Sequence, residues 1–116
     1  MRNIKEERNE AWRADLRTQI KVKERMMAER IHMPEQDALE RSRNNKEVNL
    51  GLTAEQAIVE ARRCIDCPDP TCMKGCPVSI YIPGFIKQIE TGNFLEAAKV
   101  LKETSALPAV CGRVCP

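Results

Sequence analysis

The segment that decides the fold is Cys64-Ile65-Asp66-Cys67-Pro68-Asp69-Pro70-Thr71-Cys72-Met73-Lys74-Gly75-Cys76-Pro77. A second cysteine pair, Cys111 and Cys115-Pro116, follows later in the chain. The prolines and the glycine of the first segment prevent regular structure and predict a loop that wraps tightly around something. Thiolates gathered in such a loop are rarely needed for packing, and they suit a soft metal centre.

The spacing of the loop cysteines is typical of runs that hold iron–sulfur clusters in bacterial ferredoxins. Three of them would bind irons of one cluster: Cys64, Cys67 and Cys72. In such runs the cysteine before proline serves a second cluster, so Cys76 would serve that cluster with Cys115. Two four-iron clusters need about eight ligands, and the chain has six cysteines. We therefore expect further ligands beyond Pro116, in a larger parent protein.

Three other interpretations of the cysteines remain open from spacing alone. A zinc site would take four thiolates, Cys64, Cys67, Cys111 and Cys115. A thioredoxin-like redox pair would use Cys64 and Cys67, but no strand–helix–strand pattern surrounds them. A disulfide scaffold belongs to secreted proteins, and the N-terminus shows no apolar leader.

The composition limits how the chain is stabilised and what it binds. Aromatic residues make up only 3% of the sequence, so a thin aliphatic core would gain from a metal cluster as a staple. The net charge of +2 arises from mixed acids and bases without a basic stripe, which argues against nucleic-acid binding. No apolar stretch is long enough to cross a membrane. We expect a cytoplasmic, reducing environment, where clustered cysteines bind metal.

The N-terminal residues predict a long charged helix over 4–31, ended by Pro34. Apolar residues recur on it at helical spacing: Trp12, Leu16, Ile20, Met27 and Ile31. The rest of its surface is expected to be solvated, with a docking surface as the alternative. His32, the only histidine, is expected to take a surface or capping role rather than to bind metal. Residues 33–52 are expected to form an extended connector.

Three further helices are expected in the remainder, which makes the predicted fold all-α. The first begins at a capping box of Thr53 and Gln56 and runs into Cys64. The second has Pro83 near its first turn and ends at Gly92, and Asn93 caps the third. The expected buried residues are Ala54, Ala57, Ile58 and Ala61, then Ile82, Phe85, Ile86 and Ile89, then Phe94, Ala97, Ala98 and Leu101. The expected organisation is a charged helix over 1–32, the connector, and a helical iron–sulfur domain over 53–116.

Two cations stand beside candidate ligands in the sequence, Lys74 and Arg113. They would stabilise a negatively charged cluster or raise its potential, with simple solvent exposure as the alternative. No glycine-rich nucleotide loop and no Ser-His-Asp pattern is present. The chain therefore shows cluster ligands but no site for a nicotinamide, a flavin or an organic substrate.

Several stretches of the chain resemble one known iron–sulfur module. They are Ala61-Arg62-Arg63-Cys64-Ile65-Asp66-Cys67, Cys72-Met73-Lys74-Gly75-Cys76-Pro77-Val78, Ile82-Pro83-Gly84-Phe85-Ile86, Leu107-Pro108-Ala109-Val110-Cys111-Gly112-Arg113-Val114-Cys115-Pro116 and, upstream, Met33-Pro34-Glu35-Gln36-Asp37. The module resembles the N-terminal domain of the glutamate synthase small (β) subunit. It is shared by the N-terminal part of dihydropyrimidine dehydrogenase and the large subunit of NADH-dependent ferredoxin:NADP oxidoreductase.

The resemblance implies an α-helical ferredoxin-like fold with irregular Cys-rich loops and two [4Fe–4S] clusters. By position, three cysteines match ligands of one cluster whose fourth ligand lies past Pro116: Cys64, Cys67 and Cys72. Cys76 and Cys115 match ligands of the other cluster, while Cys111 matches a cysteine that is generally not a ligand. FAD- and NADPH-binding domains follow the module in the family, so no catalytic residue can be assigned here.

From this resemblance we expect an electron relay between a flavin and a partner subunit of an NADPH-dependent, glutamate synthase-like oxidoreductase. The partners implied are the downstream FAD and NADPH domains and a large catalytic subunit or second protomer. The alternatives are the same module in a pyrimidine-reducing or ferredoxin-linked enzyme, or a zinc-stapled structural or interaction domain. The chain by itself is expected to be non-catalytic and poor in clusters.

Overall fold

Helices and loops make up the fold in a computed structural model that describes residues 2–115. In chain order the helices are α1 (Ile4–Arg8), α2 (Ala11–Gln19), α3 (Val22–Met27), α4 (Ala38–Arg41), α5 (Ala54–Ala61), α6 (Thr71–Lys74), α7 (Ile82–Glu90), α8 (Phe94–Lys102) and α9 (Pro108–Val114). Within the described residues the only extended pairing is one isolated bridge, between Glu35 and Asn49. The all-α prediction is therefore confirmed. None of the helices in this range is long and apolar enough to cross a membrane.

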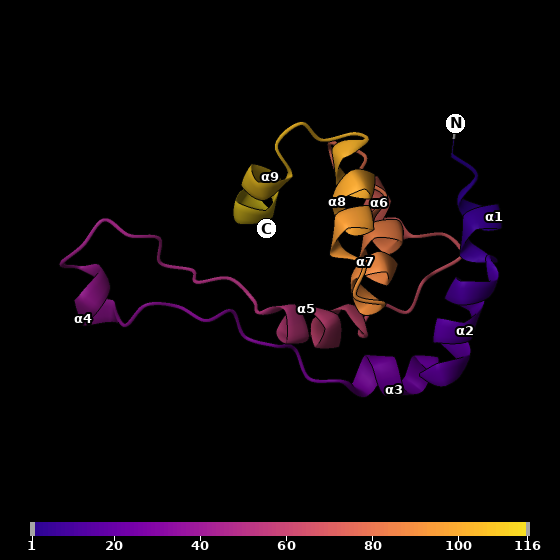
Figure 1. Cartoon of the computed structure of the whole chain (residues 1–116), viewed down its shortest axis with the longest axis horizontal. Helices are drawn as coiled ribbons and strands as arrows, with labels where there is room; N and C mark the ends of the chain where they lie inside the picture. The colour runs from indigo at the N-terminus through magenta and orange to yellow at the C-terminus, as the bar shows by residue number, and fades with distance from the viewer. Residues whose placement is uncertain (1, 116) are drawn as a thin grey trace.

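The N-terminal segment is three short helices rather than the single helix predicted over 4–31. The chain leaves α2 at Ile20, which is extended (φ −124°, ψ 114°). The Glu24 carboxylate then accepts the Lys21 N–H at 3.0 Å and starts α3. No proline or glycine causes these breaks, and the last helix ends at Met27, before Pro34. Figure 1 shows the result: α1 and α2 descend along one side of the molecule, and α3 turns beneath it.

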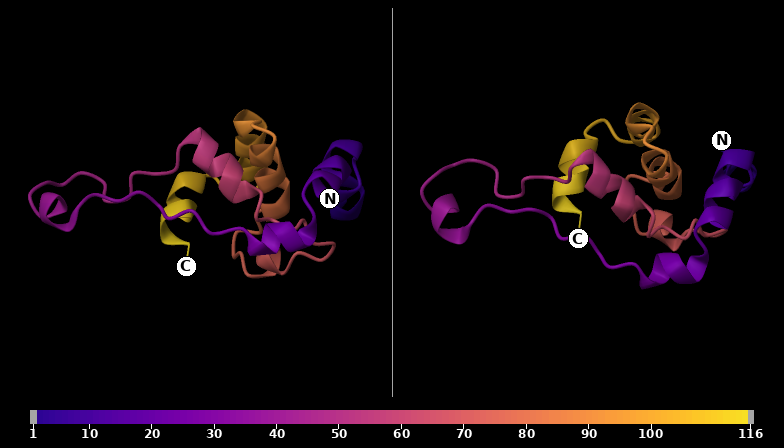
Figure 2. Two further views of the ribbon diagram at one scale, coloured as in Figure 1. Left: turned by 90° about the horizontal axis from the view of Figure 1, so that it is seen from below. Right: turned by 60° about the horizontal axis from the view of Figure 1, so that its bottom comes forward.

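The expected connector over 33–52 forms an arm that carries α4 at its tip. Backbone hydrogen bonds join its two limbs, from Gln36 to Val48 at 2.9 Å and from Leu50 to Pro34 at 2.7 Å. The arm projects away from the other helices in every view (Figures 1 and 2). It also makes the Cα radius of gyration 15.7 Å, against about 13 Å for a compact domain of this length.

The helical body is built from α5, α7 and α8. Helices α7 and α8 lie side by side, and α5 packs against α7. The predicted capping box of Thr53 and Gln56 is present. Gly92 adopts φ +80° just after α7, as a helix-ending glycine should. Asn93 is the N-cap residue of α8, but its side chain donates to Thr91 instead of capping.

The core is small and unusually polar. Its buried hydrophobic residues are Ala61, Ile80, Tyr81 and Ala97. The predicted apolar face of α7, which includes Phe85 and Ile86, is only half-buried. The residues that α7 buries are Pro83, Gly84, Lys87 and Glu90. On α8, Ala97 is buried as expected, whereas Phe94 and Ala98 are exposed. Charged side chains from distant segments fill the space that these apolar groups were expected to occupy.

Two glycines test this packing. A Cβ on Gly84 would overlap the Tyr81 ring, whose hydroxyl is already bonded to Arg13, so Gly84→Ala should lower the free energy of unfolding by about 1–3 kcal/mol. A Cβ on Gly112, inside α9, meets no atom within 4 Å. Gly112→Ala should raise stability by roughly 0.5–1 kcal/mol. Urea denaturation measures both values, and equal effects of the two substitutions would contradict this packing.

Candidate metal centre

The candidate ligands flank two short helices. Cys64 follows α5, Cys72 lies on α6, and Cys67 and Cys76 lie on the loops around α6. Cys111 lies on α9, and Cys115 is the C-cap residue of that helix. All six thiols are free; Cys72 and Cys115 are exposed and the others are half-buried. Pro116, which completes the second Cys-Pro pair, lies outside the described residues.

The four loop thiols are close enough to act on one another electrostatically. Burial raises the pKa of the Cys64 thiol, and the charge of Cys72 raises it further. Burial also raises the pKa of Cys72, to which Cys67 and Cys76 add. Four neighbouring thiolates would repel one another, and a bound cation would relieve that repulsion.

The neighbouring backbone favours the thiolate form of several of these cysteines. Hydrogen bonds from the backbone of Ile80 and Val78 lower the pKa of the Cys76 thiol. The turn that presents them includes Ser79 in a left-handed conformation (φ +56°). The Asp66 backbone acts in the same way on Cys64, and the Met73 backbone on Cys72. Hydrogen bonds to sulfur favour the thiolate form that binds metal and are one of the devices that tune iron–sulfur centres.

No single-ion site is assembled among the described residues. Within residues 2–115 no three Cys, His, Asp or Glu side chains are gathered closely enough to hold one metal ion. The four-thiolate zinc set considered above is therefore not assembled: Cys64, Cys67, Cys111 and Cys115. The donors of the loop are free thiols, which favour soft metals, and separate cysteines bind the irons of a multi-iron cluster. The donor set of this loop is thus chemically compatible with such a cluster.

Cys111 has a different environment from the loop cysteines. Its sulfur lies 3.4 Å from the hydroxyl of Ser105, a residue with 3% exposure just before α9. This contact joins α9 to the loop that connects it to α8. A thiol held by a buried hydroxyl in this way supports the local packing without any metal.

Asp66 is the most constrained residue of the cysteine loop. It lies between Cys64 and Cys67, is fully buried, and adopts a left-handed backbone conformation (φ +52°). Its carboxylate binds Arg13 and, at 2.7 Å, Arg17. Helix α2 thus supplies both cations that bind this carboxylate.

The Arg13 guanidinium is itself buried and donates hydrogen bonds to two different side chains. It donates to Asp66 and, at 2.5 Å, to the hydroxyl of Tyr81. Burial opposes the charge of Arg13, but these hydrogen bonds outweigh it and raise the pKa of the guanidinium. Arg8 adds a further contact, because its Nε donates to the Asp66 carbonyl oxygen at 2.7 Å.

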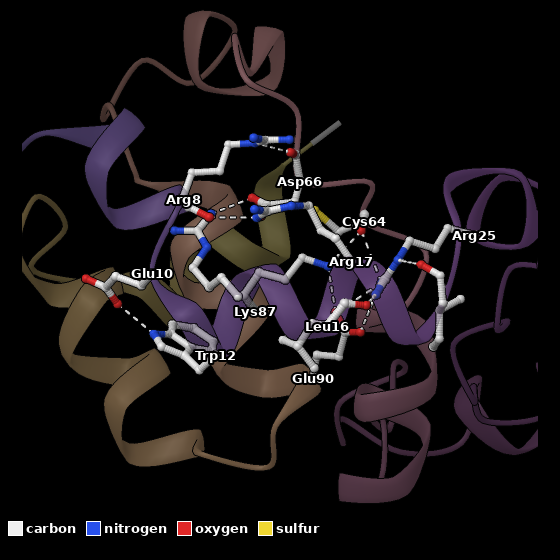
Figure 3. A network of polar contacts seen from close by, with 12 residues as sticks. Arg8, Glu10, Trp12, Leu16, Arg17, Arg25, Cys64, Asp66, Lys87 and Glu90 are labelled. Carbon is white, nitrogen blue, oxygen red and sulfur yellow. Dashed lines mark hydrogen bonds and ion pairs between the residues drawn. The ribbon is translucent and has the colours of Figure 1, made fainter.

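A second buried ionic group holds Cys64, the first residue of the turn. The carboxylate of Glu90 accepts Arg25 at 2.8 Å and Lys87 at 2.6 Å. Lys87, which has no exposed surface, also donates to the Cys64 carbonyl oxygen at 2.8 Å. Arg25 reaches the same oxygen at 3.3 Å. Figure 3 shows Lys87, Glu90 and Arg25 converging beside Cys64, with Asp66 and Arg17 nearby.

These ionic groups are the main feature that sequence reasoning missed. Lys74 and Arg113, the cations expected near the cysteines, instead pair at the surface with Asp69 (2.9 Å) and Glu47 (2.5 Å). The charged N-terminal segment is not simply solvated, because Arg13 and Arg25 are each 2% exposed. One signal was present: Lys87 and Glu90, three residues apart, interrupt an otherwise apolar helix. His32 is exposed, as predicted.

Comparisons with known proteins agree with the character of this site. Residues 41–116 match the protein family described as "Dihydropyrimidine dehydrogenase domain II, 4Fe-4S cluster". The chain is 41% identical over 76 residues, 66% of its length, to the NADPH glutamate synthase small chain of Halomonas elongata. It is 42% identical over 84 residues, 72% of its length, to the PreT homologue of Salmonella typhi, an NAD-dependent dihydropyrimidine dehydrogenase subunit. It is 48% identical over 61 residues, 53% of its length, to the glutamate synthase small chain of Escherichia coli.

The chain corresponds to only a small part of these relatives. The aligned segment covers 16% of the Halomonas protein, 19% of the Salmonella protein and 13% of the Escherichia coli protein. The likeness therefore concerns the cysteine-containing module. The three N-terminal helices precede the segment that matches the family.

Removing the Asp66 carboxylate should expose how much the fold depends on it. Asp66→Ala leaves Arg13 buried without its anion, and loss of one partner of a buried ion pair costs about 3–5 kcal/mol. Asp69 is the matched control, because it lies in the same loop with a side chain that is 77% exposed and pairs only with Lys74. Asp69→Ala should leave the urea midpoint unchanged. Similar midpoints for the two variants would show that the buried pair does not stabilise the fold.

Proposed function

This chain belongs to the family described as dihydropyrimidine dehydrogenase domain II with a 4Fe-4S cluster, and on that basis we propose that it is the electron-transfer domain of an NADPH-dependent flavoprotein of the glutamate synthase small-subunit type. The observation that carries the proposal is the Cys64–Cys76 loop, which places four free thiols around the short helix α6 in the spacing typical of iron–sulfur runs. When bound there, an iron–sulfur cluster supplies one-electron transfer.

We assign the ligands in two sets, by their position in the loop and by the Cys-Pro pattern. The first set is Cys64, Cys67 and Cys72. The second is Cys76 and Cys115. A four-iron cluster takes four cysteine ligands, so each set needs further thiolates from outside residues 1–116. Cys111 is assigned to neither set, because its sulfur already contacts Ser105.

In the parent protein the domain would pass electrons between a flavin and the cofactors of a partner subunit. FAD, NADPH and the reaction itself belong to further domains in this proposal, in a cytoplasmic enzyme. Exposed apolar side chains support the presence of such neighbours: Leu95 is 72% exposed and Val114 is 73% exposed. We propose residues 53–116 as the cluster-binding unit, preceded by the helices of 1–32 and the arm of 33–52.

A pyrimidine-reducing parent is the second candidate. The similarity to the dihydropyrimidine dehydrogenase subunit, 42% over 84 residues, is as high as that to the Halomonas glutamate synthase chain. The module is shared between these enzymes, so the substrate of the parent separates the two candidates. Glutamate synthesis, against pyrimidine reduction, is the deciding assay on the parent enzyme with its partner subunit.

Anaerobic reconstitution tests cluster binding on this chain directly. The chain is incubated with iron, sulfide and an excess of a small thiol. The small thiol supplies the cluster ligands that the two cysteine sets lack. We expect iron and acid-labile sulfide to be bound in equal amounts, with broad visible absorption that bleaches on reduction. Bound zinc without sulfide, or no bound metal under these conditions, would contradict the proposal.

The ligand assignment predicts a contrast between two single substitutions. Cys72→Ala removes a ligand from the loop and should lower the iron bound after reconstitution by about half, because one of two clusters is lost. Cys111→Ala removes a thiol that contacts Ser105 and should leave the iron content unchanged. Iron and sulfide analysis measures both variants. An equal loss from Cys111→Ala would overturn the assignment.

A further inference from the structure

The Cys64–Cys67 turn is held from outside the segment that matches the family. Four arginines reach it or its carboxylate partners from α1, α2 and α3: Arg8, Arg13, Arg17 and Arg25. Residues 41–116 match the family, and all four arginines precede that range. The contacts span the chain, because Arg13 is 53 residues from Asp66 and Arg25 is 65 residues from Glu90.

We propose that α2 and α3 are a functional part of the cluster site: they form a cationic clamp that fixes the Cys64–Cys67 turn in its metal-binding conformation. Arg25 and Lys87 are positioning residues for Cys64, and Arg13 and Arg17 are positioning residues for Asp66. The role in cluster binding rests on the function proposed above, whereas the fixing of the turn does not.

Geometry supports the clamp at Cys64. Lys87 and Arg25 bond the same carbonyl oxygen, and Glu90 holds both of their charges. Arg25 also donates to the backbone oxygens of Leu16 at 2.6 Å and Arg62 at 2.7 Å. One guanidinium thus ties the end of α2 to the end of α5, immediately before the first ligand. A buried guanidinium with this many acceptors is fixed in position by the fold, unlike the guanidinium of a surface ion pair.

Geometry also supports the clamp at Asp66. A left-handed residue other than glycine is disfavoured, and it persists only where its surroundings enforce it. Arg8 holds the backbone oxygen of this residue, and two arginines hold its carboxylate. The clamp therefore fixes the residue that lies between the proposed ligands Cys64 and Cys67.

The charges of the clamp favour a bound anionic cluster. Each buried carboxylate faces two cations, so positive charge remains in excess beside Cys64. Positive charge in a buried setting stabilises thiolates and a negatively charged cluster, and it raises the reduction potential. Lys74 and Arg113, which pair at the surface, do not provide this charge.

The first test follows the turn without any metal. Alkylation of Cys64 by iodoacetamide is measured by mass spectrometry in the full chain, alongside hydrogen exchange of α7 and α8. Arg25→Met should speed the alkylation of Cys64 by about tenfold or more, since a hydrogen bond to a charged group contributes at least that factor. Lys23→Met, at an exposed position on the same helix, should alkylate like the wild-type chain. Equal rates in the two variants would overturn the clamp.

A second variant covers the case in which Arg25→Met fails to fold. Arg25→Met combined with Lys87→Met and Glu90→Leu removes the whole ionic group, and apolar replacement of a complete buried group usually preserves folding. If this triple variant keeps wild-type exchange in α7 and α8 but alkylates rapidly at Cys64, the clamp is supported. Wild-type protection of Cys64 in the folded triple variant would overturn it.

The last test uses reconstituted protein and separates charge from geometry. Arg25→Lys keeps the charge but loses the planar fork, so it should speed the alkylation of Cys64 while keeping the wild-type midpoint potential. Arg25→Met should both speed the alkylation of Cys64 and lower the midpoint potential. Equal potentials in Arg25→Met and wild type would remove the electrostatic part of the proposal. If the wild-type chain binds no iron and sulfide, the proposed function fails, and the alkylation result still decides whether the clamp exists.

Discussion

Two buried carboxylates, Asp66 and Glu90, organise this molecule. Each is inaccessible to solvent or nearly so, and each is bound by two cations. Both cations on Asp66 come from the distant helix α2, whereas Glu90 binds Arg25 of α3 and Lys87 of its own helix. A buried carboxylate is costly unless it is fully paired. Each carboxylate therefore requires cationic partners. The N-terminal segment bends at Ile20, and as a result α2 supplies the cations that bind Asp66 and α3 supplies one that binds Glu90.

This arrangement explains a fold with little apolar core. The buried hydrophobic residues are few, and large apolar side chains such as Met27 and Leu95 lie at the surface, at 76% and 72% exposure. A buried ionic group specifies geometry more than it adds stability, because desolvation offsets much of the attraction. The missing stability would come from metal binding, which couples to folding in small domains. The ionic groups surround the loop in which that metal is proposed to bind.

The local features of the sequence predicted the local features of the structure. Thr53 and Gln56 form their capping box, Gly92 ends α7, and the proline-rich cysteine segment is irregular. What could not be predicted was set by contacts distant in sequence. Hydrophobic periodicity predicted that Phe85 and Ile86 are buried and gave no reason to bury Lys87. Lys87 is buried because it shares the Glu90 carboxylate with Arg25, which lies 62 residues earlier and cannot be inferred from the pattern of one helix. The candidate cysteine ligands stood out from spacing, whereas the residues that hold the turn did not.

The central claim is that the Cys64–Cys76 loop binds an iron–sulfur cluster that carries single electrons. Electron paramagnetic resonance of the reconstituted chain, before and after chemical reduction, tests it most directly. We predict no signal from the oxidised protein and the signal of a reduced four-iron cluster after reduction, in proportion to the sulfide bound. The signal should be lost in a variant that lacks all five assigned ligands, Cys64, Cys67, Cys72, Cys76 and Cys115. A chain that binds metal but shows no reducible paramagnetic centre would contradict the account and make the cysteine loop a structural staple.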